Sequence, residues 1–246
     1  MSALLPKRII PREHGVWFMW LVPVLLGAVL GGLHPAHLLV LLSAFSVHLA
    51  SHAALEAVRE GGRGGPLWRW AAGMGAAAVA LMAYPVWRFP VIVLFGAAAV
   101  AAFALNLYFA RRRQERTLLN DALAIAGLEL WGPVSYLVGS GRLDRDAGLL
   151  WLLCFVFFMG TAFHVKTVFR ERDDPAFKRL SDLVHLGLLG LPALLGLPQM
   201  GWAYVPSALR TWLMPRRRRL RPLTVGLVEI GNAVLFMLLL AGLWPD

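Results

Sequence analysis

Long apolar runs alternate with short polar or charged segments along almost the whole chain. Each run is continuous, whereas a half-buried strand would alternate apolar and polar residues, so the runs indicate helices. Most of them are long enough for a helix to cross a hydrocarbon layer of about 30 Å. The pattern predicts an all-α bundle of about nine transmembrane helices. The expected spans are residues 14–33, 36–56, 68–85, 90–110, 118–139, 147–165, 181–197, 199–213 and 223–243.

The seventh and eighth runs are short, and prolines interrupt them at Pro192, Pro198 and Pro206. These two runs could be separate spans or one re-entrant pair. The glycine-rich patch at residues 61–65 is typical of a loop. Because no internal repeat or low-complexity tail divides the sequence, we expect a single integral membrane domain over residues 1–246.

Composition excludes an ordinary soluble domain, since 59% of the 246 residues are hydrophobic and only 15% are charged. The single cysteine, Cys154, excludes an intrachain disulfide and a cysteine-based zinc site. The first apolar run lacks a small-residue cleavage site at its end, so we expect it to stay in the protein as the first span.

The basic residues predict the orientation. With the N-terminus in the cytoplasm, the segments on that side carry 21 of the 24 Lys and Arg residues. The other side carries only Arg88, Arg142 and Arg145. Such an asymmetry is the orientation signal of membrane proteins, and it predicts a cytoplasmic N-terminus with nine spans. The net charge of +10 therefore does not indicate nucleic acid as a partner; membrane lipids are the expected surroundings.

Ionisable residues inside spans are costly and are functional candidates by default. Glu129 lies near the middle of the fifth span and needs a partner or a water-filled cavity. Glu229 and Asn232 are three residues apart in the ninth span and share a helix face. A basic residue of the preceding loop, Arg219 or Arg221, could instead pair with Glu229.

Two other polar groups have both a functional and a structural interpretation. His48, His52 and Glu56 form a stripe on the second helix, either as a metal face or as a hydrogen-bonded seam between helices. Asn120 and Asp121 open the fifth span, where they could bind a ligand or only cap the helix.

Residues 164–174 form the densest charged segment. It could be a loop that faces lipid head groups, or it could be part of an anion site. In the second interpretation a phosphate or diphosphate would be held by basic residues predicted on one side of the membrane, namely Arg12, Arg116, Lys166 and Arg170. Asp173 and Asp174 could then hold a bridging Mg²⁺.

Several motifs resemble those of the YwiC-like bacterial membrane proteins. The most specific is Pro-Arg-Glu-His-Gly-x-Trp at residues 11–17, which ends at Trp17. Weaker matches are Arg116-Thr117-Leu118-Leu119-Asn120, His164-Val165-Lys166-x-x-x-Arg170-Glu171 and Gly226-x-x-Glu229-Ile230-Gly231-Asn232. The resemblance implies a multi-pass protein of the bacterial inner membrane, and the family has no settled activity.

More distantly, the chain resembles the UbiA-type intramembrane prenyltransferases. Those enzymes have nine helices and cytoplasmic catalytic loops after the second and sixth spans, where this chain has its loops at 56–66 and 166–180. Their acidic motif at the end of the second span holds Mg²⁺ on a prenyl diphosphate. The corresponding stretch here, residues 48–56, has Glu56 as its one carboxylate and no Asp. The resemblance therefore implies the architecture more than the catalysis.

Together these features predict a cavity that opens to the cytoplasm and binds an anionic, lipid-like or prenyl ligand. Its cofactor is unknown. The head group would be held by the four basic residues above, with Trp17, Asn120, Glu229 and Asn232 as further contacts. Glu13, His14 and Glu129 would orient or protonate the ligand. One alternative is a Mg²⁺-dependent prenyltransferase with Glu56, Asp173 and Asp174 as metal ligands, and another is a small transporter or scaffold.

Overall fold

The computed structural model describes residues 10–11, 15–61, 65–214 and 220–245. The predicted site residues Arg12, Glu13 and His14 lie outside these ranges. All regular structure within them is helical. The helices are α2 (Val16–Gly31), α3 (His37–Arg59), α4 (Gly65–Arg88), α5 (Ile92–Arg111), α6 (Leu118–Glu129), α7 (Trp131–Ser140), α8 (Arg145–Phe169), α9 (Pro175–Leu194), the 3₁₀ helix η2 (Pro198–Tyr204), α10 (Val205–Leu213) and α11 (Pro222–Leu243).

Six stretches are long and apolar enough to cross a membrane: α3, α4, α5, the α6–α7 pair, α8 and α11. The apolar helix α2 is shorter, with 16 residues. In the most apolar part of each helix, only 17% of the residues of α4 and 11% of those of α5 are buried. Because such exposed apolar faces need a hydrocarbon surrounding, the chain is a polytopic helical membrane protein.

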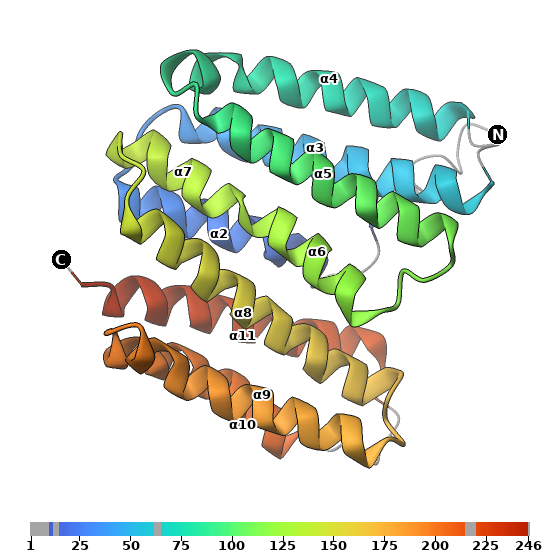
Figure 1. Ribbon diagram of the computed structural model, residues 1–246, viewed down its shortest axis with the longest axis vertical. Helices are drawn as coiled ribbons and strands as arrows, with labels where there is room; N and C mark the ends of the chain where they lie inside the picture. Colours follow the sequence, from blue (N-terminus) through green and yellow to red (C-terminus); the bar gives the residue numbers. More distant parts are fainter. Residues whose placement is uncertain (1–9, 12–14, 62–64, 215–219, 246) are drawn as a thin grey trace. The chain divides into compact units, whose positions relative to one another are not determined.

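Contacts divide the chain into two compact units, residues 1–151 and 152–246, and α8 runs from the first into the second. Within the first unit, α3 packs against α4 and α5, as Figure 1 shows. The other close pair in this unit is α2 with α7. Within the second unit, η2 packs against α9 and α11, and α10 lies against α9. The expectation of a single domain stays a prediction.

Glycines set the α2–α7 contact. A Cβ atom added to Gly27 would lie 2.7 Å from Ser135 Cβ and 2.8 Å from the Tyr136 backbone nitrogen. One turn later in α2, Gly31 faces the backbone of Tyr136 in the same way. Small residues let membrane helices approach this closely and so increase their contact. The Ser135 hydroxyl adds a hydrogen bond of 2.7 Å to the Val24 carbonyl oxygen.

The fifth predicted span is correct in extent but is not one helix. It is interrupted at Leu130, which separates α6 from α7. Pro133 accounts for the interruption, because it has no N–H group to donate to the carbonyl oxygen four residues earlier, that of Glu129. The chain continues in the same membrane-spanning stretch up to Ser140.

Aromatic side chains form the core of the second unit. The rings of Phe157 and Phe236 are stacked with centroids 3.8 Å apart. Tyr204 lies edge-on to Phe236 at 5.4 Å, and its hydroxyl donates to the Leu153 carbonyl oxygen at 2.9 Å. These contacts join α8, η2 and α11, because each helix contributes a ring to the same core.

The seventh predicted span corresponds to the helix α9, and the eighth corresponds to the 3₁₀ helix η2 followed by α10. α9 begins at Pro175, six residues earlier than expected, because the Asp174 side chain caps it and proline suits the first helical turn. After Gly196, which has a φ of +81°, the eighth segment starts as η2 and continues as α10.

Candidate functional site

The inward faces of the helices in the second unit change from apolar to polar along their length. On α8 the buried face passes from Phe157 to Thr161 and His164. On α11 it passes, in the opposite chain direction, from Phe236 to Asn232 and then to Glu229. The polar ends of both faces therefore lie where α8 finishes and α11 starts.

Arg210 of α10 is at the centre of these polar groups and is 8% exposed. Its guanidinium forms an ion pair with the Glu229 carboxylate. The same guanidinium contacts His185 Nε2 at 3.2 Å and Thr211 Oγ1 at 3.5 Å. Three helices, α9, α10 and α11, are thus joined through one side chain.

The hydrogen bonds of His185 determine its tautomer. Its Nδ1 lies 2.7 Å from the Ser181 carbonyl oxygen, which can only accept, so Nδ1 carries the hydrogen. Nε2 faces an Arg210 N–H group, which can only donate, and it therefore accepts with its lone pair. His185 is accordingly a neutral imidazole that helps to hold the guanidinium.

His164 links the same group to α8. Its Nδ1 lies 3.2 Å from Thr211 Oγ1, and its Nε2 lies 3.3 Å from the Met214 sulfur and 3.9 Å from Glu229 Oε1. These positions are consistent with Thr211 donating to Nδ1 while Nε2–H faces the thioether and the carboxylate. His164 is fully buried, so this contact forms without exposure to solvent.

Ser207 and Asn232 extend the network by one turn. The Asn232 amide nitrogen donates to Ser207 Oγ at 2.9 Å, and Ser207 Oγ is 3.2 Å from the amide oxygen. We call the residues linked in this way the Arg210 network; its members are His164, His185, Ser207, Arg210, Thr211, Glu229 and Asn232.

The Arg210 network contains one full positive charge and one full negative charge, so it is neutral as a whole. A buried ion pair is stable only when further hydrogen bonds satisfy its polar atoms, as His185 and Thr211 do for Arg210. The planar guanidinium also has the geometry for a carboxylate or a phosphate. The network can therefore act as a structural lock or as a preformed anion site.

The first unit contains a buried carboxylate with a different environment. Glu129 has no exposed surface, and neither of its side-chain oxygens has a hydrogen-bond partner among the described residues. It is the last residue of α6, directly before the interruption at Leu130. Its position inside the membrane-spanning stretch agrees with the sequence analysis, while its proposed catalytic role stays a prediction.

Of the predicted ligand-binding residues that the structure describes, Glu229 and Asn232 are joined in the second unit as members of the Arg210 network. Arg116 and Arg170 are exposed, and Lys166 is buried at the end of α8. Their convergence on one ligand stays a prediction.

Two further predicted ligand contacts have local structural partners. Asn120 donates from Nδ2 to the Glu115 carbonyl oxygen and thereby shapes the start of α6. The Trp17 ring packs against the imidazole of His48 with centroids 4.8 Å apart. These contacts explain the local structure, and they leave the ligand-binding roles as predictions.

The predicted metal ligands also have local partners. Glu56 pairs with Arg59, one turn later in α3. Asp174 accepts hydrogen bonds from the backbone nitrogens of Ala176 and Phe177 as the cap of α9, while Asp173 is exposed. No three His, Cys, Asp or Glu side chains are grouped as metal ligands in the described part of the chain. The Mg²⁺ site stays a prediction.

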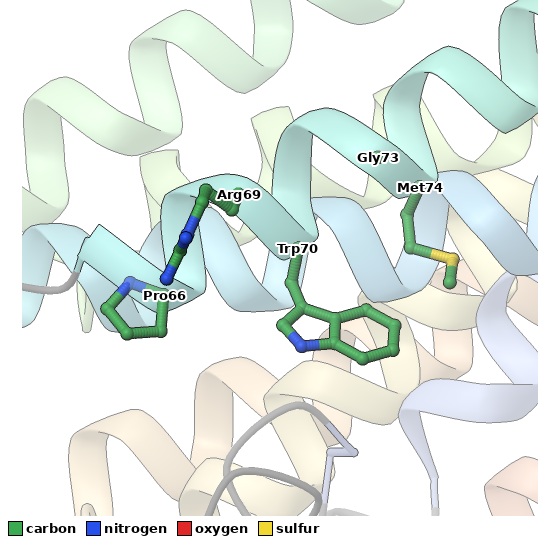
Figure 2. A pocket seen from close by; sticks show the side chains of 5 residues that line it. All are labelled: Pro66, Arg69, Trp70, Gly73 and Met74. Carbon is green, nitrogen blue, oxygen red and sulfur yellow. The ribbon is translucent and has the colours of Figure 1, made fainter. Parts of the chain in front are cut away.

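A shallow hollow of about 290 Å³ lies on the first turns of α4. Figure 2 shows its lining side chains along one stretch of this helix. They include Arg69 and Trp70, and the missing side chain of Gly73 leaves space between turns. A basic residue beside a tryptophan at the end of a span is typical of the membrane–water interface.

Four members of the Arg210 network were missed in the sequence, namely His185, Ser207, Arg210 and Thr211. Arg210 was counted with the charges of the loop that follows the eighth span, and His185 was not singled out. A spacing signal was present, since Ser207 and Arg210 are three residues apart, as are Glu229 and Asn232. Two facing helices with the same spacing of polar residues can form two contacts, as they do here.

With this geometry described, comparison with known proteins decides the family. A family model described as "YwiC-like protein" matches residues 10–136, which is more than half of the chain. The chain belongs to the YwiC-like family. The matched region includes Trp17 and Glu129 and ends before the Arg210 network.

Relatives within this family match over nearly their whole length. "Uncharacterized protein YwiC" of Bacillus subtilis (strain 168) is 35% identical over 234 residues, or 94% of this chain and 96% of that protein. An "Uncharacterized protein" of Haemophilus influenzae (strain ATCC 51907 / DSM 11121 / KW20 / Rd) is 32% identical over 243 residues, covering 95% and 98%. No solved structure matches significantly. The YwiC-like assignment therefore extends over the whole chain, and the distant resemblance to UbiA-type enzymes is not part of it.

Proposed function

We propose that this YwiC-like membrane protein binds an anionic, lipid-like ligand and holds its head group at Arg210. The supporting observation is a buried guanidinium that already binds a carboxylate, that of Glu229, inside a membrane protein. Charged residues inside membrane helices are rare and mark ligand or ion sites by default. A prenyl diphosphate is the class that we would test first, because its head is anionic and its tail is apolar.

Competition with Glu229 would be the basis of binding. A phosphate group offers more oxygen acceptors than a carboxylate and a larger charge, so it can displace Glu229 from the guanidinium. His185 would stay on the other side of Arg210, because its Nε2 accepts a separate N–H group. His164, 3.9 Å from Glu229 Oε1, could then donate to the displaced carboxylate or to the ligand.

Entry from the cytoplasmic side is the second part of this proposal. The charge pattern of the sequence supports it, since the segments after α8 and before α11 are among the most basic of the chain. Lys166 and Arg170 would attract the anionic head on that side, together with Arg12 and Arg116. A cavity that opens there would take the tail.

A thermal-shift measurement on the detergent-purified protein tests this proposal. Geranylgeranyl diphosphate at 100 times its dissociation constant should add about 2.7 kcal/mol to the stability of the folded protein. The shift should disappear in Arg210→Gln and persist in Lys178→Gln, which removes an exposed cation of α9. If the wild type shows no shift with any prenyl diphosphate or anionic lipid, the proposal is wrong.

Repeating the thermal-shift measurement with and without Mg²⁺ tests prenyl transfer as a second function. The close spacing of Glu171, Asp173 and Asp174 favours it, because carboxylates bind the Mg²⁺ that bridges to a diphosphate. In that case the shift should require Mg²⁺ and should be lost in Asp173→Asn and in Glu56→Gln. A shift that is independent of Mg²⁺ would favour binding without transfer. No shift would favour transport or scaffolding instead.

A further inference from the structure

Among the described residues, Glu129 has no partner of the kind that a carboxylate inside a membrane protein requires. It is fully buried, and neither carboxylate oxygen accepts a hydrogen bond from any described residue. An ionised carboxylate in such a place costs several kcal/mol unless a positive charge accompanies it. By contrast, Glu229, the other deeply buried glutamate of the described chain, has Arg210.

The neighbouring helices do not supply this charge. α2, α5 and α7 pack against α6. Within their bounds the one acidic or basic residue is Arg111, the last residue of α5. Arg111 lies near the start of α6, whereas Glu129 is at its other end, about 16 Å further along the axis. From α8, the nearby contact is the uncharged indole of Trp151, which donates to the Ala126 carbonyl oxygen at 3.1 Å.

The helix interruption leaves a second oxygen atom of Glu129 without its usual donor. Because residue 133 is proline, the Glu129 carbonyl oxygen cannot accept the hydrogen bond that a continuous helix would give it. Interrupted helices in membrane proteins expose such carbonyl groups to ions, typically near the middle of the bilayer. Here one residue contributes both a free carboxylate and a carbonyl oxygen without its usual donor.

We propose that Glu129 is the carboxylate ligand of a monovalent-cation site at the interruption between α6 and α7. A single carboxylate is neutralised by a single positive charge, and no group of three metal-ligating side chains in the described residues indicates a multivalent ion. The occupant is a proton or Na⁺, which have the same charge and can both bind carboxylate oxygen. This site lies in the first unit and takes the opposite charge to the ligand of Arg210, so neither proposal depends on the other.

Labelling with dicyclohexylcarbodiimide, an apolar reagent that modifies protonated carboxyl groups within membranes, tests the site. Wild-type protein in vesicles is treated in buffer free of Na⁺, and modified peptides are quantified by mass spectrometry. We expect Glu129 to be modified at least tenfold more than Glu229, which is also buried, with 6% exposed, but is paired with Arg210. Glu129→Gln should remove the modified peptide.

Addition of 100 mM NaCl, with choline chloride as the control, distinguishes the two occupants. Protection of Glu129 by Na⁺ but not by choline assigns the site to Na⁺, and equal labelling in both salts assigns it to a proton. If Glu129 is modified no more than Glu229 in Na⁺-free buffer, its carboxylate has a partner within the protein and the proposal is overturned. Because the comparison is made within one wild-type chain, it does not depend on the folding of a variant.

Discussion

Arg210 and Glu229 form an ion pair inside the second unit, although both belong to apolar helices and only 19 residues separate them in the chain. Each side chain is 5% exposed. The pair joins α10 to α11 within the buried part of this unit. The same two residues are therefore both a structural connection and the proposed anion site.

Removing one partner of this pair should destabilise the protein more than removing both. Arg210→Met or Glu229→Leu alone leaves an uncompensated buried charge, at an expected cost of about 3 kcal/mol. The double variant should regain most of this loss. Chemical unfolding in detergent, followed by circular dichroism, gives the coupling energy of the two residues.

The pair Lys178–Asp182 is the matched control. It joins oppositely charged residues four apart on α9, with side chains 52% and 27% exposed. Its coupling energy should lie below about 0.5 kcal/mol. Equal coupling energies for the two pairs would contradict the view that burial makes the Arg210–Glu229 pair important.

Gly27→Ala should destabilise the first unit. The added Cβ atom would lie 2.7 Å from Ser135 Cβ, so α2 and α7 must move apart, at about 1–3 kcal/mol. Gly96→Ala in α5 is the control, since a Cβ atom there meets no atom within 4 Å. That substitution should gain up to about 1 kcal/mol from helix propensity. Opposite signs in the thermal melting of the two variants would support the close α2–α7 contact.

Asp174 should prove to be a helix cap in the absence of ligand. Asp174→Asn retains a side-chain oxygen that accepts from the backbone nitrogens of Ala176 and Phe177. It should therefore melt within a degree or so of the wild type, whereas Asp174→Ala should lose about 1 kcal/mol. If Mg²⁺ also binds at Asp174, Asp174→Asn should abolish the Mg²⁺-dependent thermal shift while the melting temperature without ligand stays the same. This result would separate the metal-binding role of Asp174 from its capping role.

Residues 142 and 173 should lie on opposite sides of the membrane. They flank α8, whose 25 residues extend about 37 Å. Cys154, the single native cysteine, is buried, so the wild type provides an unreactive background. A membrane-impermeant thiol reagent should label Arg142→Cys in intact cells and Asp173→Cys only after permeabilisation. The reverse result would show that the charge pattern was interpreted with the wrong orientation.

The apolar runs allowed the helical class and most helix limits to be predicted, because a membrane requires long continuous helices. Six of the nine predicted spans are long and apolar enough in the structure to cross a membrane. Local exceptions came from prolines. Pro133 divides the fifth span at Leu130, which the hydrophobic pattern does not reveal because both halves are apolar. Pro198 and Pro206 marked the eighth span as irregular, yet the sequence did not indicate that it starts as a 3₁₀ helix.

Candidate site residues were recognisable where a polar side chain interrupts an apolar run, as for Glu129, Glu229 and Asn232. Arg210 was harder, because an arginine near the end of a span looks like an orientation signal. Its role depends on contacts with α9 and α11, which are distant in sequence. Pairing of this kind depends on how the helices pack, and a single sequence contains little information about that packing.

The glycine contact between α2 and α7 also has a consequence for how the chain is made. Ser135 and the Val24 carbonyl that it contacts are separated by 111 residues. At about 5–20 residues per second, α2 is synthesised about 5 to 20 seconds before its partner helix. During that interval α7 is not yet present to cover the glycine face of α2. We therefore expect lipids or an insertion factor to shield this face of α2 until translation has passed residue 140.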